Sequence, residues 1–168
     1  MTQPALKTRV TEEDPRTGME GKEREVVAQE LSRSLAYTYR LFVMTQGVHW
    51  NVQGPLFYSV HKLTEEQYND MFEAIDDLAE RIRALGFPAP QTLKALTADA
   101  ELDEPALDAQ LEAQIETLVE GHERTARVLR DGVHKAEEMG DVKSADLMTD
   151  RIGLHEEHAW MLRSTVAS

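Results

Sequence analysis

Residues 71–85, MFEAIDDLAERIRAL, carry the pattern that decides the fold. The apolar residues in this stretch step by 4, 3, 4 and 3 positions: Met71, Ile75, Leu78, Ile82 and Leu85. This spacing is that of an α-helix packed lengthwise against other helices. Gly86 comes next, and glycine is favoured just past a helix C-terminus. The stretch therefore predicts a long helix that ends at about residue 85.

Apolar residues recur with helical spacing over most of the remaining chain. They predict further helices at about 23–51, 91–96, 105–139 and 143–166. Gly54-Pro55 separates the first helix from the second, and the alternating pattern of strands is absent. Residues 1–20 are polar and are expected to form a flexible tail. We therefore predict an all-α protein in which residues 21–168 form one four-helix bundle domain, with a short extra helix between the second and third long helices.

The composition limits the chemistry that the chain can perform. With 168 residues it suits one compact domain, and without cysteine it cannot form disulfides or thiolate metal sites. A transition-metal site must then use His, Asp and Glu, which favours iron, manganese, zinc or magnesium. The formal charge of −13 predicts attraction of cations, although a well-solvated surface is the alternative reading. No apolar run long enough for a membrane span and no secretory signal are visible, so a cytoplasmic protein is expected.

Two pairs of potential metal ligands lie on the predicted second helix. His61 and Glu65 are four residues apart, and so are Asp76 and Glu80. At about 100° per residue, all four fall on one lateral stripe beside the apolar seam. His49, near the end of the first helix, is a further candidate. Such pairs often belong to an ordinary helix surface, so their spacing alone leaves both interpretations open.

The separation between the two pairs determines how they could share a metal ion. Glu65 and Asp76 are 11 residues apart, which is about 16 Å along a straight helix. Since metal–ligand bonds are about 2 Å long, one ion cannot be held by both pairs of the same chain. A two-fold axis between antiparallel copies of this helix would bring the His–Glu pair of one chain against the Asp–Glu pair of the other. The spacing therefore predicts a metal site that requires two chains.

The chain resembles the Dps family, the miniferritins that are also called DNA-binding proteins from starved cells. The resemblance rests on HWNVQGP at residues 49–55, on the twelve-residue step from His49 to His61, and on AIDDLAER at residues 74–81. It extends over about residues 25–166. It implies a ferritin-like four-helix bundle that assembles into a hollow homododecamer with tetrahedral symmetry.

The resemblance also implies an activity. Members of the family are ferroxidases that oxidise Fe²⁺, preferentially with hydrogen peroxide, and store Fe³⁺ mineral inside the shell, which protects DNA and the cell from oxidative damage. The implied iron ligands, for which zinc is a candidate substitute, are His49, His61 and Glu65 of one chain with Asp76 and Glu80 of another. The family commonly has Asp where this chain has Glu65, which reaches one methylene further and is still a hard oxygen ligand.

Residues near the site and on the fourth helix are candidates for supporting roles. By resemblance, Trp50, next to His49, is a candidate radical trap, and the alternative is a large core anchor. Asp141, Asp146 and Asp150 lie where family members line a three-fold pore for iron entry, and an acidic ring there would concentrate cations. Asp141 and Asp146 have the alternative role of stabilising a helix N-terminus.

His155 and His158 are three residues apart on the predicted last helix. They are candidates for a secondary metal site, but two side chains supply too few ligands, so buried or interface histidines are the alternative. His122 and His134 have no partner that the sequence identifies, and we expect ordinary helix residues there.

The sequence offers little support for DNA binding. The first 25 residues contain five basic and six acidic side chains, so the tail is near neutral and weak or absent DNA binding is expected. A nucleoid-packing DNA-binding scaffold with little ferroxidase activity is the alternative function, and peroxide-driven iron oxidation by the pure protein would separate the two. A larger ferritin needs Glu-x-x-His inside its bundle, and no histidine here has Glu three residues before it.

Overall fold

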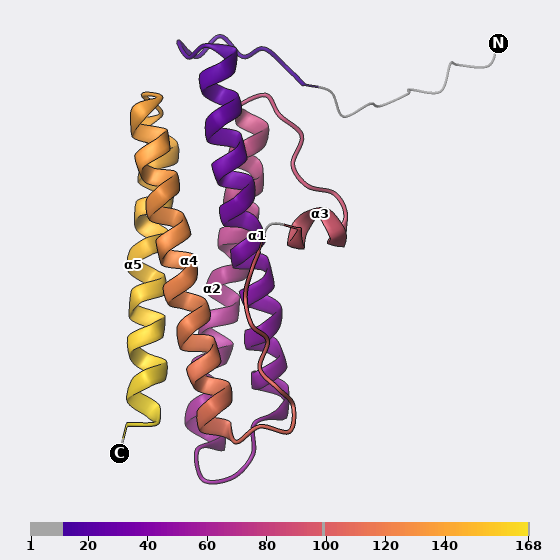
Figure 1. Ribbon diagram of the computed structural model, residues 1–168, viewed down its shortest axis with the longest axis vertical. Helices are drawn as coiled ribbons and strands as arrows, with labels where there is room; N and C mark the ends of the chain where they lie inside the picture. The colour runs from indigo at the N-terminus through magenta and orange to yellow at the C-terminus, as the bar shows by residue number, and fades with distance from the viewer. Residues whose placement is uncertain (1–11, 99, 168) are drawn as a thin grey trace, which may run out of the picture.

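The computed structural model describes residues 12–98 and 100–167 as a bundle of four long helices (Figure 1). These helices and one short helix are α1 (Gly21–Asn51), α2 (Phe57–Ala84), α3 (Leu93–Thr97), α4 (Leu111–Glu138) and α5 (Val142–Thr165). No strand occurs in the described residues, which confirms the predicted all-α class and the short extra helix. Of the helices described, none has the length and apolar character needed to cross a membrane.

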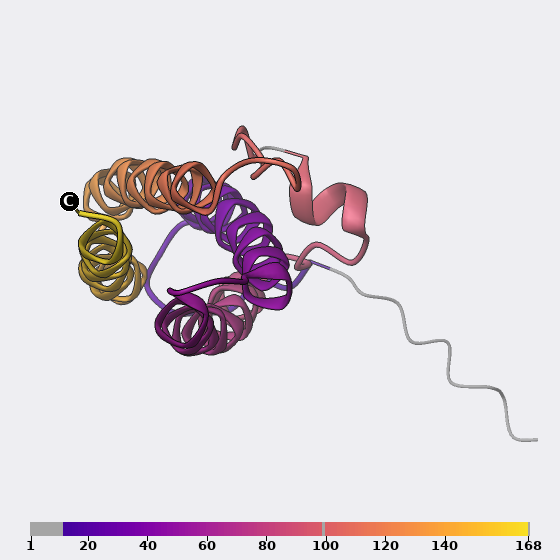
Figure 2. The same ribbon diagram turned by 90° about the horizontal axis from the view of Figure 1, so that it is seen from below.

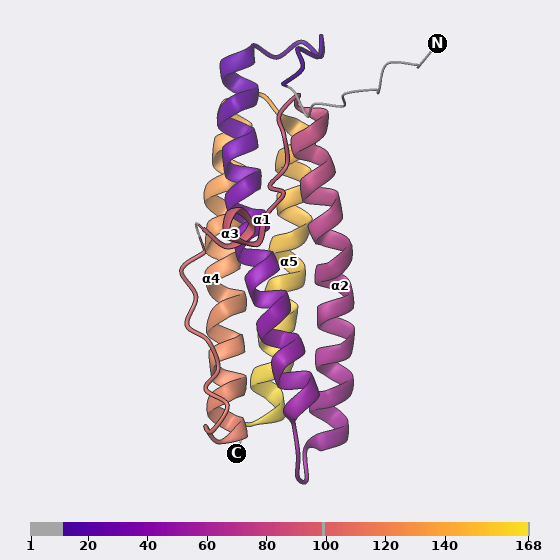
Figure 3. The same ribbon diagram turned by 90° about the vertical axis from the view of Figure 1, so that its right-hand side faces the viewer.

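The order of the helices around the bundle is visible along its axis (Figure 2). α1 packs against α2 and α4, and α5 packs against the same two helices. After α2 the chain runs back along the outside of the bundle, where α3 lies against α1, before α4 begins (Figure 3). α2 and α4 therefore run in the same direction. One long crossover in an otherwise up-and-down bundle is the connection of ferritin-like folds.

The third long helix starts later than predicted, at Leu111 instead of about residue 105. α4 is 28 residues long, or about 42 Å, and the crossover must span a comparable length. An extended residue advances about 3.3 Å, whereas a helical residue advances only about 1.5 Å. If α4 began earlier, fewer extended residues would remain to span the distance between the end of α2 and the start of α4. Leu107, which the predicted helix would have included, is 77% exposed. Ala100 and Leu102 are buried instead, and Arg40 donates a hydrogen bond to the Ala100 carbonyl at 2.7 Å.

The apolar core consists of two clusters, one toward each end of the bundle. The first gathers around Leu41, Met71 and Leu118, and the second around Leu31, Leu78 and Leu129. On α5, Met148 belongs to the second cluster and Ala159 to the first. The buried α5 residues between these two are all polar: Arg151, His155 and His158. Along α5, a polar layer therefore separates the apolar residues of the two clusters.

The end of the predicted N-terminal tail is attached to the bundle. The Glu13 amide donates to the Gly86 carbonyl at 2.8 Å, and Arg24 pairs with Asp14 at 2.5 Å. A Cβ on Gly86 would lie 2.3 Å from the Glu13 carbonyl oxygen, and the φ of Gly86 is +97°, so both the close approach and the backbone require glycine. The rest of the predicted tail, residues 1–11, lies outside the described residues.

Asp141 fastens the start of α5 to α2. Its carboxylate accepts hydrogen bonds from the Ser144 amide at 3.0 Å and the Ser144 hydroxyl at 2.6 Å, which makes it the N-cap of α5. Arg81 of α2 donates to the same carboxylate at 2.7 Å. Burial by itself would raise the pKa of Asp141, but the hydrogen bonds from Ser144 and Arg81 outweigh it and lower the pKa. Of the two roles considered for Asp141, the geometry favours the helix cap.

The substitution D141N tests this ionic anchor, because asparagine keeps a capping oxygen and loses the charge. A carboxylate whose folded-state pKa is depressed stabilises the fold above its unfolded pKa, and the contribution is lost as pH falls through the folded pKa. We expect D141N to lower the free energy of unfolding by about 1–3 kcal/mol at neutral pH. The difference should shrink as the pH falls below about 4. Urea unfolding followed by circular dichroism across pH measures both values, with D146N as an exposed control. A deficit that is independent of pH would contradict the ionic role.

Candidate metal-binding site

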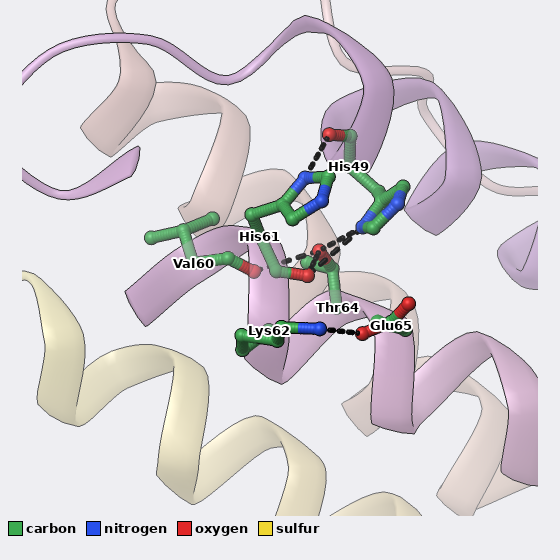
Figure 4. A network of polar contacts seen from close by, with 6 residues as sticks. All are labelled: His49, Val60, His61, Lys62, Thr64 and Glu65. Atoms are coloured by element: carbon green, nitrogen blue, oxygen red, sulfur yellow. Dashed lines mark hydrogen bonds and ion pairs between the residues drawn. The ribbon is translucent and has the colours of Figure 1, made fainter. Parts of the chain in front are cut away.

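His49 and His61 form a stacked pair where the end of α1 meets the start of α2 (Figure 4). Their ring centres are 3.8 Å apart and their planes differ by 16°. The Nδ1 of His61 bonds to the His49 carbonyl at 3.0 Å, and the Nδ1 of His49 bonds to the His61 carbonyl at 2.9 Å. Because a carbonyl oxygen only accepts, both Nδ1 atoms carry hydrogen, and the Nε2 of each neutral ring keeps its lone pair. Two imidazole nitrogens are thus in the form that binds metal.

The helix ends explain why this reciprocal pair forms. The last four carbonyls of an α-helix have no partner within the helix, and that of His49 is one of them in α1. His61 satisfies this carbonyl after a short turn in which Gly54 has a φ of +88°. Thr64, which is fully buried, gives its hydroxyl hydrogen to the Val60 carbonyl at 2.7 Å and lies 3.3 Å from the Nδ1 of His49 as an additional acceptor. The turn and Thr64 therefore orient His49.

Aromatic side chains hold the two imidazoles from the side. Phe57 stacks on His61 with ring centres 5.0 Å apart. Tyr68 meets His49 edge-on at 5.1 Å, with an angle of 79° between the planes. Sequence reasoning did not identify Phe57, Thr64 or Tyr68 as parts of the site. Only their helical spacing around His61 and Glu65 could have indicated them.

Glu65 lies one turn beyond His61 on α2 and accepts a hydrogen bond from Lys62 at 2.6 Å (Figure 4). This hydrogen bond, and then the charge of Lys62, lower the pKa of Glu65. The carboxylate is therefore ionised near neutral pH. Exposed ion pairs of this kind contribute little to stability, so a metal ion can take the place of Lys62 at modest cost.

Asp76 and Glu80 lie on the exposed side of α2, further along the helix. Neither side chain makes a hydrogen bond or ion pair with a described residue. Because α2 is one continuous helix, the 11-residue separation of Glu65 from Asp76 remains about 16 Å. Within residues 12–98 and 100–167 of one chain, no group of three or more His, Asp or Glu side chains is placed to hold a metal ion. The structure pairs His49 with His61, places Glu65 one turn further along α2, and leaves the Asp–Glu pair apart from them.

The structure also places the residues with predicted supporting roles. Trp50 is 69% exposed, so it is not a core anchor within one chain. Asp146 and Asp150 are exposed on α5, and Asp146 pairs with Lys143 at 3.0 Å. Of the three predicted pore residues, Asp141 is therefore buried as a helix cap, and Asp146 and Asp150 face solvent.

His155 and His158 lie inside the bundle, and His122 joins them there. The Nδ1 atoms of His122 and His155 are 2.9 Å apart, so one donates to the other. His158 lies with its Nε2 3.1 Å from the carboxylate of Asp70, which also accepts two hydrogen bonds from Arg151 at 2.8 and 2.5 Å. His122 was expected to be an ordinary helix residue without a partner, and that expectation was wrong. Its place in the apolar seam of the third long helix was the available signal.

Burial and charge set the protonation of this cluster. Burial lowers the pKa of His122 well below the ordinary value, and the positive charge of Arg151 acts in the same direction. Burial also lowers the pKa of His155, with Arg151 next in importance. For Asp70, burial would raise the pKa, but the hydrogen bonds from Arg151 and His158 reverse the effect and hold it far below the ordinary value. The two most buried imidazoles are therefore neutral and Asp70 is ionised near neutral pH.

The substitution D70N is expected to destabilise the bundle, because it leaves the buried Arg151 without its anionic partner. Breaking a buried ion pair from one side costs about 3–5 kcal/mol. The Asp70 side chain is 26% exposed, so we expect a loss of about 2–4 kcal/mol in the free energy of unfolding. The matched control is E73Q, an exposed acid one turn further along α2, which should change stability by less than about 0.5 kcal/mol. Equal denaturation midpoints for the two variants would contradict the buried pair.

Known proteins are similar to this chain over most of its length. The Ferritin-like domain family matches residues 28–168. A low temperature-induced protein of Nostoc sp. is 39% identical over 151 residues, covering 89% of this chain and 84% of the relative. DNA protection during starvation protein 2 of Bacillus anthracis is 31% identical over 138 residues, covering 82% and 94%.

Solved structures share the fold. The DPS protein of Vibrio cholerae O1, described as a member of a broad superfamily of ferritin-like diiron-carboxylate proteins, superposes with a TM-score of 0.83. The two chains are 28% identical, and the match covers 95% of this chain and 99% of the other. The similarity therefore includes all four long helices and the crossover between α2 and α4.

Proposed function

The chain belongs to the Dps family of ferritin-like proteins, and we propose that it oxidises Fe²⁺ at sites formed between two chains and stores the product as Fe³⁺ mineral. The observation that carries this proposal is the pair of stacked imidazoles, each with its Nε2 free for a metal, beside an ionised Glu65. Two imidazoles and one carboxylate leave coordination positions open. Family membership supports iron as the substrate.

Each site draws its remaining ligands from a second chain. His49, His61 and Glu65 of one chain face Asp76 and Glu80 of a two-fold-related copy. The separation of the two ligand groups along α2 supports this arrangement, because neither group alone can surround an ion. A two-fold axis makes two equivalent sites at each interface. Zn²⁺, which accepts the same nitrogen and oxygen ligands, should compete with Fe²⁺.

The ligand set suits a two-electron reaction. Two Fe²⁺ ions held together at one site would each give one electron to a hydrogen peroxide molecule, which takes up two protons and leaves as two water molecules. Hydroxyl radical, the product of one-electron reduction, is then avoided. The carboxylates stabilise the higher charge of Fe³⁺, which hydrolyses with release of protons and collects as oxyhydroxide. Trp50, exposed beside His49, is positioned to react with radicals that escape.

Mixing two inactive variants tests whether the site requires two chains. H61A and E80Q should each lower the initial rate of peroxide-driven Fe²⁺ oxidation by about tenfold or more. In a co-assembled equal mixture, half of the two-fold pairs are mixed, and each of these has one intact site and one doubly altered site. Activity should therefore return to about a quarter of that of the unsubstituted protein.

Two controls make this experiment decisive. D77N removes the exposed acid next to Asp76 and should leave the rate unchanged. Size-exclusion chromatography verifies that both variants assemble. If the separate variants lose activity and the mixture recovers none, the ligands do not come from two chains.

We also propose that the assembly is a hollow dodecamer and that Asp146 and Asp150 line its iron-entry pore. Both are exposed at the first turns of α5, and a ring of such carboxylates would concentrate cations. The same negative charge, −13 per chain, opposes contact with DNA phosphates. Retention of DNA at physiological salt is therefore not expected.

The double substitution D146N/D150N should slow iron uptake without removing the oxidation sites. At low ionic strength we expect the initial rate of Fe²⁺ oxidation to fall several-fold, with a smaller difference in high salt, because electrostatic steering is screened. Stopped-flow absorbance measures the rate, and E116Q, which removes an exposed acid on α4, is the control. An equal loss in E116Q would assign the effect to overall charge instead of a pore.

A further inference from the structure

The polar layer in the middle of the bundle contains three imidazoles that the proposed oxidation site does not use. His122 comes from α4, and His155 and His158 come from α5. Gln67 and Asp70 reach the same layer from α2, where the Gln67 amide nitrogen donates to the His158 carbonyl at 3.2 Å. His122, His155 and Gln67 have no exposed surface. The layer therefore brings nitrogen and oxygen atoms from α2, α4 and α5 together inside one chain.

Unpaired polar atoms concentrate in this layer. Over the described residues, eight buried side-chain nitrogen or oxygen atoms have no hydrogen-bond partner, and five of them lie here. They are Gln67 Oε1, His122 Nε2, Arg151 Nε, His155 Nε2 and His158 Nδ1. Leaving buried polar atoms unpaired is costly, and native interiors contain few of them. The concentration indicates that a bound species completes the layer.

The positions of the hydrogens show what these atoms offer. When its ring is neutral, His158 donates its Nε2 hydrogen to Asp70 and its unpaired Nδ1 carries the lone pair. The contact between the Nδ1 atoms of His122 and His155 holds one hydrogen, so one of these rings has a bare Nε2. The Oε1 of Gln67 is an acceptor as well. Two imidazole nitrogens and one amide oxygen therefore present lone pairs with nothing bound to them.

The ring separations match those of imidazoles that share one ion. The centre of the His122 ring is 5.2 Å from that of His155 and 5.3 Å from that of His158. With metal–nitrogen bonds of about 2.0–2.1 Å and tetrahedral angles, ring centres lie roughly 5 Å apart. As the rings lie, the nitrogens of His122 and His155 face each other, and the described residues form no ready-made group of three ligands. Turning a ring about its Cβ–Cγ bond changes which nitrogen faces the centre and leaves the helices in place.

We propose that His122, His155 and His158 form a second metal site inside each chain, which binds a divalent ion of the Zn²⁺ or Co²⁺ type with Gln67 as the fourth ligand. The pair formed by Asp70 and His158 supports this proposal, because metal-binding histidines usually donate their other ring N–H to a carboxylate. Arg151 in turn holds Asp70 in place.

This second site differs from the proposed oxidation site in one testable respect, because a single chain supplies all of its ligands. The double variant H61A/E80Q removes ligands of the two-chain site and leaves the core unchanged. Titration of the metal-free full-length variant with Co²⁺ should give about one ion per chain by calorimetry, with the strong visible absorption of four-coordinate cobalt. The variant should lose ferroxidase activity whether or not its core binds Co²⁺. Failure of this second site can therefore be distinguished from failure of the proposed oxidation site.

Substitutions in the core then identify the ligands. Added to H61A/E80Q, H122N and H158N should each weaken Co²⁺ binding by at least tenfold. H134N is the matched control, since His134 is exposed on the same helix as His122, and it should leave binding unchanged. Circular dichroism verifies that the variants fold.

X-ray absorption spectroscopy on the Zn²⁺ form of H61A/E80Q requires no core substitution, and it should show three imidazole ligands. The proposal is overturned if H61A/E80Q binds no ion, or if the spectrum shows fewer than two imidazoles. It is also overturned if folded H122N and H158N both retain full affinity. In each of these cases, buried water is the species that completes the layer.

Discussion

The rise of an α-helix, about 1.5 Å per residue, is the constraint on which the proposed oxidation site depends. α2 runs without interruption from Phe57 to Ala84, so the ligands near its start cannot approach those toward its end. A flexible loop could have folded both groups onto one ion, but a helix within a packed bundle cannot. In the proposed site, the separation therefore makes symmetry between two chains a requirement for holding the ion. For the same reason, a change that weakens the two-fold contact would remove the ligand set even with every ligand residue retained.

The rigid helix also explains how a precise imidazole pair forms at low cost. The end of α1 leaves carbonyl groups without partners, and His61 satisfies one of them while fixing its own orientation. The hydrogen bonds that close the α1–α2 corner therefore also place the ring hydrogens on the Nδ1 atoms and leave both Nε2 atoms with lone pairs in the neutral rings. The same two hydrogen bonds stabilise the corner and orient the imidazoles, so a substitution that breaks them would affect both the fold and the metal ligands.

Helical periodicity was sufficient to predict the buried faces of the helices, whereas features that depend on tertiary contacts were missed. The seam through Met71, Leu78 and Ile82 is buried as expected, because periodicity reports directly on which face a helix buries. The later start of α4 depends on the length that the crossover must span, which no local pattern records. The contact between His122 and His155 depends on how α4 faces α5, so a histidine in an apolar seam could be noticed but not assigned a partner.

The polar layer has a consequence for how the two halves of the bundle are joined. Along α5 it lies between residues of the two apolar clusters, so hydrogen bonds and the Asp70–Arg151 pair must provide the continuity there. Apolar side chains would stabilise this level of the core more simply, since polar groups gain little on burial even when paired. The layer is therefore stable only to the extent that its lone pairs are satisfied. An ion or water bound there would join α2, α4 and α5 at the level where α5 contributes only polar side chains to the interior.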